Sequence, residues 1–203
     1  MSEVPWTASL LALVVSYLIG SVSPATIAAN LRGKDLRSIG SGNPGATNAA
    51  RAMGTTVGVV VALLDILKGF VPAWFFGRYG QPAGELAGLA AVLGHVTSPW
   101  LRGKGGKGVA TSLGAILAVQ PLWAIPVLLA FGITVLITKR MGIGSVVGTV
   151  TLIPVSLVMW NGWAGVLFAV GLSAIVLIRH RSNIANFFAR SERTQKEGPA
   201  PQS

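Results

Sequence analysis

Long apolar stretches alternate with short polar stretches rich in glycine along nearly the whole chain. A helix that crosses the hydrocarbon core of a bilayer needs about 20 mainly apolar residues. The pattern therefore predicts an all-α integral membrane protein with about seven transmembrane helices, the fourth of them short. We expect these helices at residues 5–29, 55–76, 83–100, 109–119, 122–138, 145–160 and 163–178.

The two ends of the chain differ in character. The N-terminal apolar stretch is long enough to span, and no cleavage site of small residues follows it, so we expect a retained helix rather than a signal peptide. From Arg190 the chain is polar and contains Pro and Gln, which is typical of disorder. We therefore expect one membrane domain at residues 1–189 and a disordered polar cytoplasmic tail at 190–203.

The composition agrees with a membrane protein. Only 11% of the residues are charged, whereas globular domains carry about 25%. The 26 glycines and six tryptophans suit close helix packing and anchoring at the membrane surface. Because the chain has no cysteine, a disulfide framework and a thiolate metal site are excluded.

The basic residues decide the orientation. Cytoplasmic loops of membrane proteins carry an excess of Lys and Arg. With the N-terminus outside, the inner segments 30–54, 101–108, 139–144 and 179–203 hold 14 of the 16 basic residues. This distribution predicts an external N-terminus and a cytoplasmic C-terminus, and it explains the net charge of +10 without a nucleic-acid partner.

The first inner segment reads SIGSGNPGATNAAR from Ser38 to Arg51. Glycines let backbone N–H groups converge on an anion, and the arginine fork matches a phosphate. A helix-capping loop, with Thr47 or Asn48 beginning a short helix, explains the same residues equally well.

The second inner segment, from Leu101 to Thr111, reads LRGKGGKGVAT and directly precedes a predicted helix. A helix N-terminus with free N–H groups readily binds anions. The spacing is not that of a nucleotide-binding phosphate loop, and no strand precedes it, so we exclude an NTPase.

Asp65 and Lys68 lie inside the second predicted helix, three residues apart. At this spacing they share a face and can pair, and we expect a structural ion pair. A proton relay is the alternative, but no other carboxylate lies mid-span. The two histidines, His95 and His180, are far apart in sequence and lack an acidic cluster, so we expect no metal site.

Three motifs and one pattern in the second helix identify a resemblance. The chain resembles the bacterial acyl-phosphate-dependent glycerol-3-phosphate acyltransferases of the PlsY type, up to the start of the tail. The family's motifs are matched by residues 38–51, by 94–95 with 105–111, and by 179–184, and its D-x-x-K-G pattern is matched by residues 65–69.

The resemblance implies seven spans with the N-terminus outside, an active site on the cytoplasmic side of a bacterial inner membrane, and no cofactor. It also implies a set of substrate-binding residues around two phosphates. These are Ser41, Asn43, Arg51, Lys104, Gly105, Gly106, Lys107, Ser145, His180 and Asn183. Two positions depart from the family: Gly142 replaces a serine, and no basic residue soon follows the third motif.

The reaction implied is transfer of an acyl chain from acyl phosphate to the 1-hydroxyl of sn-glycerol 3-phosphate, giving lysophosphatidic acid and inorganic phosphate. An enzyme that makes acyl phosphate is then a candidate partner. No Ser-His-acid triad is evident, so we expect no acyl-enzyme. For the proton of the attacking hydroxyl, His180, His95 and the phosphate of the substrate are candidates, and we favour the phosphate.

Two other classes of protein would share the basic cytoplasmic face. A transporter or channel for small anions would need polar residues in mid-membrane and inverted repeats, and neither is clear. A scaffold that binds anionic lipid heads would use the same charges but gives no reason for Asn and Ser among the glycines.

Overall fold

The computed structural model describes the backbone of residues 6–197 and the side chains of residues 10–189, and this part of the chain is all helical. The helices are α1 (Trp6–Ser21), α2 (Pro24–Asn30), α3 (Ala46–Met53), α4 (Thr55–Gly77), α5 (Gln81–Thr97), η1 (Pro99–Leu101), α6 (Val109–Val119), η2 (Pro121–Trp123), α7 (Ala124–Thr138), α8 (Met141–Val150), α9 (Leu152–Val158) and α10 (Gly162–Glu197).

Five helical segments within the described residues are long and apolar enough to cross a membrane. They are Leu10–Asn30, Thr55–Gly77, Pro121–Thr138, Met141–Val158 and Gly162–Ala189. The expected spans at α5 and α6 fall short of that length, with 17 and 11 residues. An 11-residue helix rises only about 16 Å, roughly half of the hydrocarbon core. Both helices lie among the longer ones, where they shape the interior.

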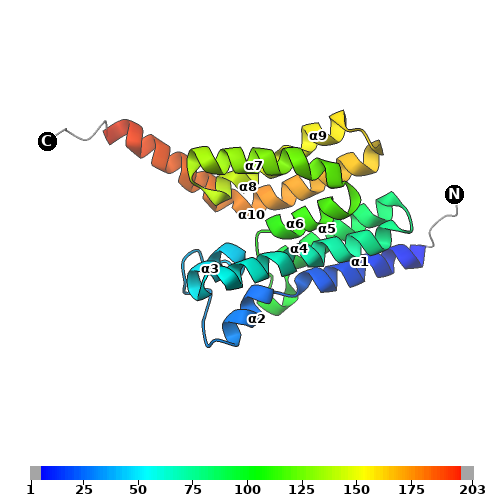
Figure 1. The fold of residues 1–203 in the computed structure, drawn as a ribbon, viewed down its shortest axis with the longest axis horizontal. Helices are drawn as coiled ribbons and strands as arrows, with labels where there is room; N and C mark the ends of the chain where they lie inside the picture. The colour runs from blue at the N-terminus through cyan, green and yellow to red at the C-terminus, as the bar shows by residue number, and fades with distance from the viewer. Residues whose placement is uncertain (1–5, 198–203) are drawn as a thin grey trace.

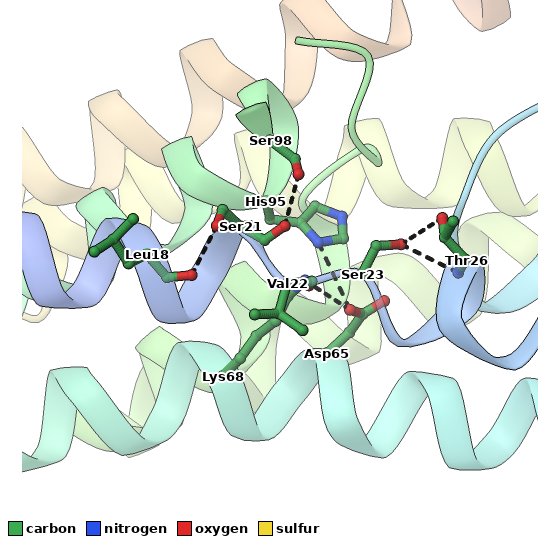
Figure 2. Close-up of polar contacts among 9 residues, drawn as sticks. All are labelled: Leu18, Ser21, Val22, Ser23, Thr26, Asp65, Lys68, His95 and Ser98. Atoms are coloured by element: carbon green, nitrogen blue, oxygen red, sulfur yellow. Dashed lines mark hydrogen bonds and ion pairs between the residues drawn. The ribbon is translucent and has the colours of Figure 1, made fainter. Parts of the chain in front are cut away.

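The first predicted span is broken at Val22 and Ser23, where α1 ends and α2 begins. Backbone groups at such a break need partners, because the bilayer interior offers no water. Lys68 Nζ donates to the Val22 carbonyl at 2.7 Å and lies 2.9 Å from Asp65 Oδ1 (Figure 2). The expected Asp65–Lys68 ion pair is therefore present, and its lysine also satisfies the broken helix.

The same break is bonded to the end of α5. Ser98 Oγ donates to the Ser21 carbonyl at 2.7 Å, and the Trp100 indole donates to Ser21 Oγ at 2.8 Å. On the other side, the Ser23 hydroxyl caps α2 by accepting from the Thr26 N–H (Figure 2). These bonds hold the break at a defined place beside α4 and α5.

Two other boundaries differ from the expectation. The sixth span is divided into α8 and α9 at Thr151. Helix α10 continues through residues 190–197, where we expected the disordered tail to begin. The rest of that expected tail, residues 198–203, lies outside the described residues.

Glycine lets α4 and α6 approach closely, which sets the rotation of α6. A Cβ atom at Gly69 would collide with the Thr111 carbonyl, and one at Gly114 would collide with the Ile66 carbonyl. Close contacts of small residues are typical of membrane helices, where packing rather than hydrophobicity drives association. Thr111 and Gly114 thus face α4, while Ala115 packs against Gly88 of α5.

The polar segments gather at one end of the bundle. The connections α2–α3, α5–α6 and α7–α8 lie there together with the second half of α10 (Figure 1). The connections α4–α5 and α9–α10 lie at the opposite end (Figure 1). Segments far apart in sequence thus meet where the three motifs were found.

Candidate active site

A cavity of about 610 Å³ opens among the motif segments, α4, α6, α7 and α8. It contains most of the residues that the resemblance implied. Those that line it are Ser41, Asn43, Arg51, Lys107, Ser145, His180 and Asn183. The structure therefore brings all three motifs to one cavity.

The second and third motifs touch directly. Lys107 Nζ donates to Asn183 Oδ1 at 2.6 Å, from the loop before α6 to α10. Partial burial lowers the pKa of Lys107, because it penalises the charged ammonium, and the positive charges of Arg179 and Arg51 lower it further. A lysine near other cations, with no acidic partner in the part of the chain that the structure describes, is suited to a ligand that brings negative charge.

The first motif forms a tight loop that ends in α3. Gly40 has a φ of 55°, which favours glycine, and a Cβ there would collide with Asn48 Oδ1. Asn48 is buried, accepts from the Ser41 N–H at 3.2 Å and donates to the Leu36 carbonyl at 3.0 Å. Asn48 thus braces the loop, while Arg51 on α3 lines the cavity. The expected short helix is present and begins at Ala46.

The glycine-rich second motif differs from the expectation. Lys104, Gly105 and Gly106 do not line the cavity. The Gly105 and Gly106 N–H groups donate to the Val96 and His95 carbonyls at 3.1 Å, so they are not free for a phosphate. A Cβ at either glycine would collide with His95. Close packing therefore explains why glycine is needed at both positions. The residues of this motif that reach the cavity are Lys107 to Ala110.

Two arginines that sequence reasoning did not assign to the site hold this loop in place. Arg179 donates to the Gly106 and Gly105 carbonyls at 3.1 and 2.7 Å. Arg37 donates to the Gly42 carbonyl at 3.1 Å and also to the Lys104 carbonyl. Arg179 lies within the third motif, which was the available signal.

The histidines have different surroundings. His180 is buried, and its Nδ1 lies 2.9 Å from the Val176 carbonyl, so Nδ1 carries the hydrogen and Nε2 is the acceptor. His95 Nδ1 lies 3.6 Å from Asp65 Oδ1 (Figure 2), a carboxylate that is 30 positions away in sequence. Both histidines and Asp65 line the cavity.

Ser145 and Gly142 line the cavity from α8. The Ser145 hydroxyl donates to the Met141 carbonyl at 2.8 Å and keeps acceptor capacity. A Cβ at Gly142 would meet the Asn183 amide group. The departure from the family at position 142 therefore lies next to the Lys107–Asn183 contact.

The far end of the cavity is apolar. Its lining there comes from α4, α6, α7 and α9, with Ile66, Leu113, Ile116, Val127, Leu128, Phe131 and Leu152. Ile116, Val127 and Leu152 are buried and belong to the main hydrophobic core. A basic, polar compartment thus continues into an apolar one within the helix bundle. No cluster of His, Asp or Glu suited to a metal lies in the described part of the chain.

Comparison with known proteins gives the family. A sequence profile described as glycerol-3-phosphate acyltransferase matches residues 10–190. The chain belongs to the glycerol-3-phosphate acyltransferase family. It is 38% identical over 188 residues to the glycerol-3-phosphate acyltransferase of Thermoanaerobacter pseudethanolicus, covering 91% of this chain and 94% of the relative. It is 39% identical over 191 residues to glycerol-3-phosphate acyltransferase 1 of Deinococcus radiodurans, with the same coverage.

The fold agrees with solved structures of this family. A crystal structure of PlsY, an integral membrane glycerol 3-phosphate acyltransferase, in its glycerol 3-phosphate form has a TM-score of 0.86 and 36% identity, covering 90% of this chain and 92% of that chain. The lysophosphatidic acid form has a TM-score of 0.84 and 35% identity with the same coverage. The protein is therefore a multi-pass membrane acyltransferase of lipid biosynthesis, as the motifs predicted.

Proposed function

We propose that this protein transfers an acyl chain from acyl phosphate to the 1-hydroxyl of sn-glycerol 3-phosphate. The products are lysophosphatidic acid and inorganic phosphate. One observation carries the proposal: a single cavity joins a basic end with Arg51, Lys107 and Asn183 to an apolar end in the bundle core. One reactant is a small phosphate and the other is a phosphate with a fatty tail, so both compartments are needed.

The orientation of the chain follows from its charges. Of the 16 basic residues, 14 fall on segments that Figure 1 shows at one end, namely the connections α2–α3, α5–α6 and α7–α8, helix α3 and the second half of α10. By the positive-inside rule this end is cytoplasmic and the N-terminus is outside. The proposed arrangement has seven crossings, in which the short α5 and α6 are enclosed by the five longer segments, in a bacterial inner membrane.

The chemistry needs little from the protein beyond positioning and charge. Acyl phosphate is a mixed anhydride, so its carbonyl carbon already bears a good leaving group. Two anions must be brought together, and cationic groups in a water-poor site offset their repulsion. Lys107 and Arg51 supply that charge, while Arg37 and Arg179 hold the loop that carries Lys107 by donating to its Lys104 and Gly106 carbonyls. No acyl-enzyme is required.

The proton of the attacking hydroxyl passes to the phosphate of glycerol 3-phosphate. His180 bonds a neutral carbonyl through Nδ1, and no carboxylate among the described side chains forms an ion pair with it, so an imidazolium there would lack an acidic partner in that part of the chain. In the proposed arrangement its Nε2 and the side chain of Asn183 hold the glycerol hydroxyls instead, and both residues line the cavity. An enzyme that makes acyl phosphate is the partner that this reaction requires.

The test is a turnover assay with purified protein in detergent. Palmitoyl phosphate and glycerol 3-phosphate are mixed, and both phosphate release and lysophosphatidic acid are measured. We expect phosphate release that depends on both reactants and is unchanged by a chelator. Release that needs no glycerol 3-phosphate would indicate hydrolysis, and uptake into vesicles without turnover would support an anion transporter.

A further inference from the structure

Many hydroxyl groups on the helices of this protein donate to backbone carbonyls. Those that donate to the carbonyl four residues back are Thr97, Thr134, Thr138, Ser145, Thr149 and Thr151. Ser112 on α6 is different: its residue is 3% exposed, and its Oγ, like the hydroxyl oxygens of Ser16 and Thr111, has no partner among the described residues. A buried polar atom without a partner costs stability and needs an explanation.

Ser112 lies on the face of α6 that lines the cavity. Val109, Ser112, Leu113 and Ile116 share that face at helical spacing and all line it. Thr111 also has an unpartnered hydroxyl, but it does not line the cavity, and its backbone packs against Gly69 of α4. The two neighbouring hydroxyls therefore differ in surroundings, which makes Thr111 a matched control.

The position of Ser112 along α6 is intermediate between the two compartments. Lys107 and Gly108 line the basic end, and Ile116 lines the apolar end. With a rise of 1.5 Å per residue, Ser112 lies about 6 Å from Gly108 and about 6 Å from Ile116 along the axis. The carbonyl of an acyl phosphate is likewise the junction between its phosphate and its alkyl chain.

We propose that Ser112 Oγ donates a hydrogen bond to the carbonyl oxygen of the acyl phosphate and to the oxyanion that this oxygen becomes. The inference rests on the proposed function, since it places the phosphate at the Lys107 end and the chain among Leu113 and Ile116. A donor aimed at developing charge in a water-poor site stabilises the transition state more than the ground state. The missing protein partner of Ser112 is then the substrate.

The step balances without any change to Ser112. The oxygen of the glycerol 1-hydroxyl forms a bond to the acyl carbon, and the carbonyl π electrons move to its oxygen. The hydroxyl proton passes to the phosphate of glycerol 3-phosphate. When the carbonyl re-forms, the bond from carbon to the phosphate oxygen breaks, and inorganic phosphate leaves with the electron pair.

The experiment compares Ser112→Ala with Thr111→Val in purified protein. We expect kcat of the Ser112→Ala variant to fall about 10²- to 10³-fold, as for other lost oxyanion donors. Its KM for glycerol 3-phosphate should stay within about twofold of the unaltered protein. Its Tm should be unchanged or higher, because an unsatisfied buried hydroxyl has been removed. The Thr111→Val variant should keep its kcat.

Two further measurements separate a contact with the carbonyl from a structural role. Hexadecyl phosphate lacks the carbonyl, so its inhibition constant should be the same for the unaltered protein and for the Ser112→Ala variant. The Ser112→Cys variant keeps the side-chain shape but offers only a weak donor. Its kcat should therefore lie between that of the unaltered protein and that of the Ser112→Ala variant. Weakened binding of hexadecyl phosphate in the Ser112→Ala variant would overturn the proposal.

Failure of the proposed function and failure of the Ser112 assignment would give different results. If the unaltered protein shows no turnover that depends on both reactants, the proposed function fails. If it turns over and the Ser112→Ala variant retains full kcat, the assignment of Ser112 alone is wrong. An acyl adduct on Ser112 in the intact mass would also overturn the proposal, because it would make this hydroxyl a nucleophile.

Discussion

Lys107 donates a 2.6 Å hydrogen bond to Asn183, although 76 positions separate the two residues in the chain. The contact joins the loop before α6 to the second half of α10. It therefore couples the residue that we assign to phosphate binding with one that we assign to the glycerol. Arg179 reinforces the same junction by donating to two carbonyls of that loop.

Removal of a cavity cation should weaken substrate binding more than removal of a surface cation. Both arginines are exposed, but Arg51 lines the cavity, whereas Arg32 does not and its guanidinium donates to the Ala28 carbonyl. A hydrogen bond to a charged group contributes about 1.5–3 kcal/mol, so Arg51→Ala should lower kcat/KM about 10- to 100-fold. Arg32→Ala is the matched control and should change it less than twofold. Equal losses in both variants would contradict the assignment of the site.

The pH dependence should show a loss of activity on the alkaline side. Burial and the nearby arginines lower the pKa of Lys107 below the 10.5 of an ordinary lysine. The free enzyme therefore loses this positive charge at a lower pH than usual, and kcat/KM should fall as pH rises through that pKa. In the Lys107→Arg variant this alkaline decline should disappear, because a guanidinium stays charged. An unchanged decline in that variant would assign it to another group.

Neither histidine should behave as an indispensable general base. If the phosphate of glycerol 3-phosphate takes the proton, His180→Gln and His95→Gln should each lower kcat by less than about 10³-fold at saturating substrate. His180→Gln should also raise KM for glycerol 3-phosphate, since we assign it to binding. A larger loss of kcat with intact binding would identify that histidine as the base and exclude the substrate-assisted route.

Helix positions were predictable because the bilayer dictates the length of apolar stretches. The predicted range 109–119 agrees with α6, and 55–76 differs from α4 by one residue. The break at Val22 and Ser23 was not predicted, although Pro24 was visible. A break in membrane requires a partner for its carbonyl, and that partner is Lys68 of α4, which only the packing of the helices reveals.

The motifs indicated which segments meet at the cavity, but the surroundings of individual residues could not be inferred from them. Ser41, Lys107 and Asn183, which the resemblance implied as substrate-binding residues, line the cavity, and their roles stay predictions. Gly105 and Gly106 look like phosphate ligands by composition, yet their N–H groups are bonded to the end of α5. Composition cannot distinguish glycine needed for an anion from glycine needed for close packing, because both uses exploit the missing Cβ.

The unusual glycine at position 142 should be important for the Lys107–Asn183 contact. A Cβ there would meet the Asn183 amide, so Gly142→Ser should displace Asn183 and raise KM for glycerol 3-phosphate about 10-fold. Gly132→Ser is the control, because position 132 on α7 has open space around it. A lower KM in the Gly142→Ser variant would instead show that a serine adds a contact to the phosphate.

The buried Asp65–Lys68 pair should stabilise the fold rather than take part in the chemistry. Loss of one partner leaves a buried charge unpaired, which costs about 3–5 kcal/mol, or about 6–20 °C in Tm for a chain of this size. Asp65→Asn and Lys68→Met should therefore each lower Tm in detergent, and Lys68→Met also leaves the Val22 carbonyl without its donor. The double variant should lose less than the sum of the two, because no lone charge remains. At a temperature where it is folded, the double variant should keep turnover within about 10-fold, and a larger loss would support the proton relay instead.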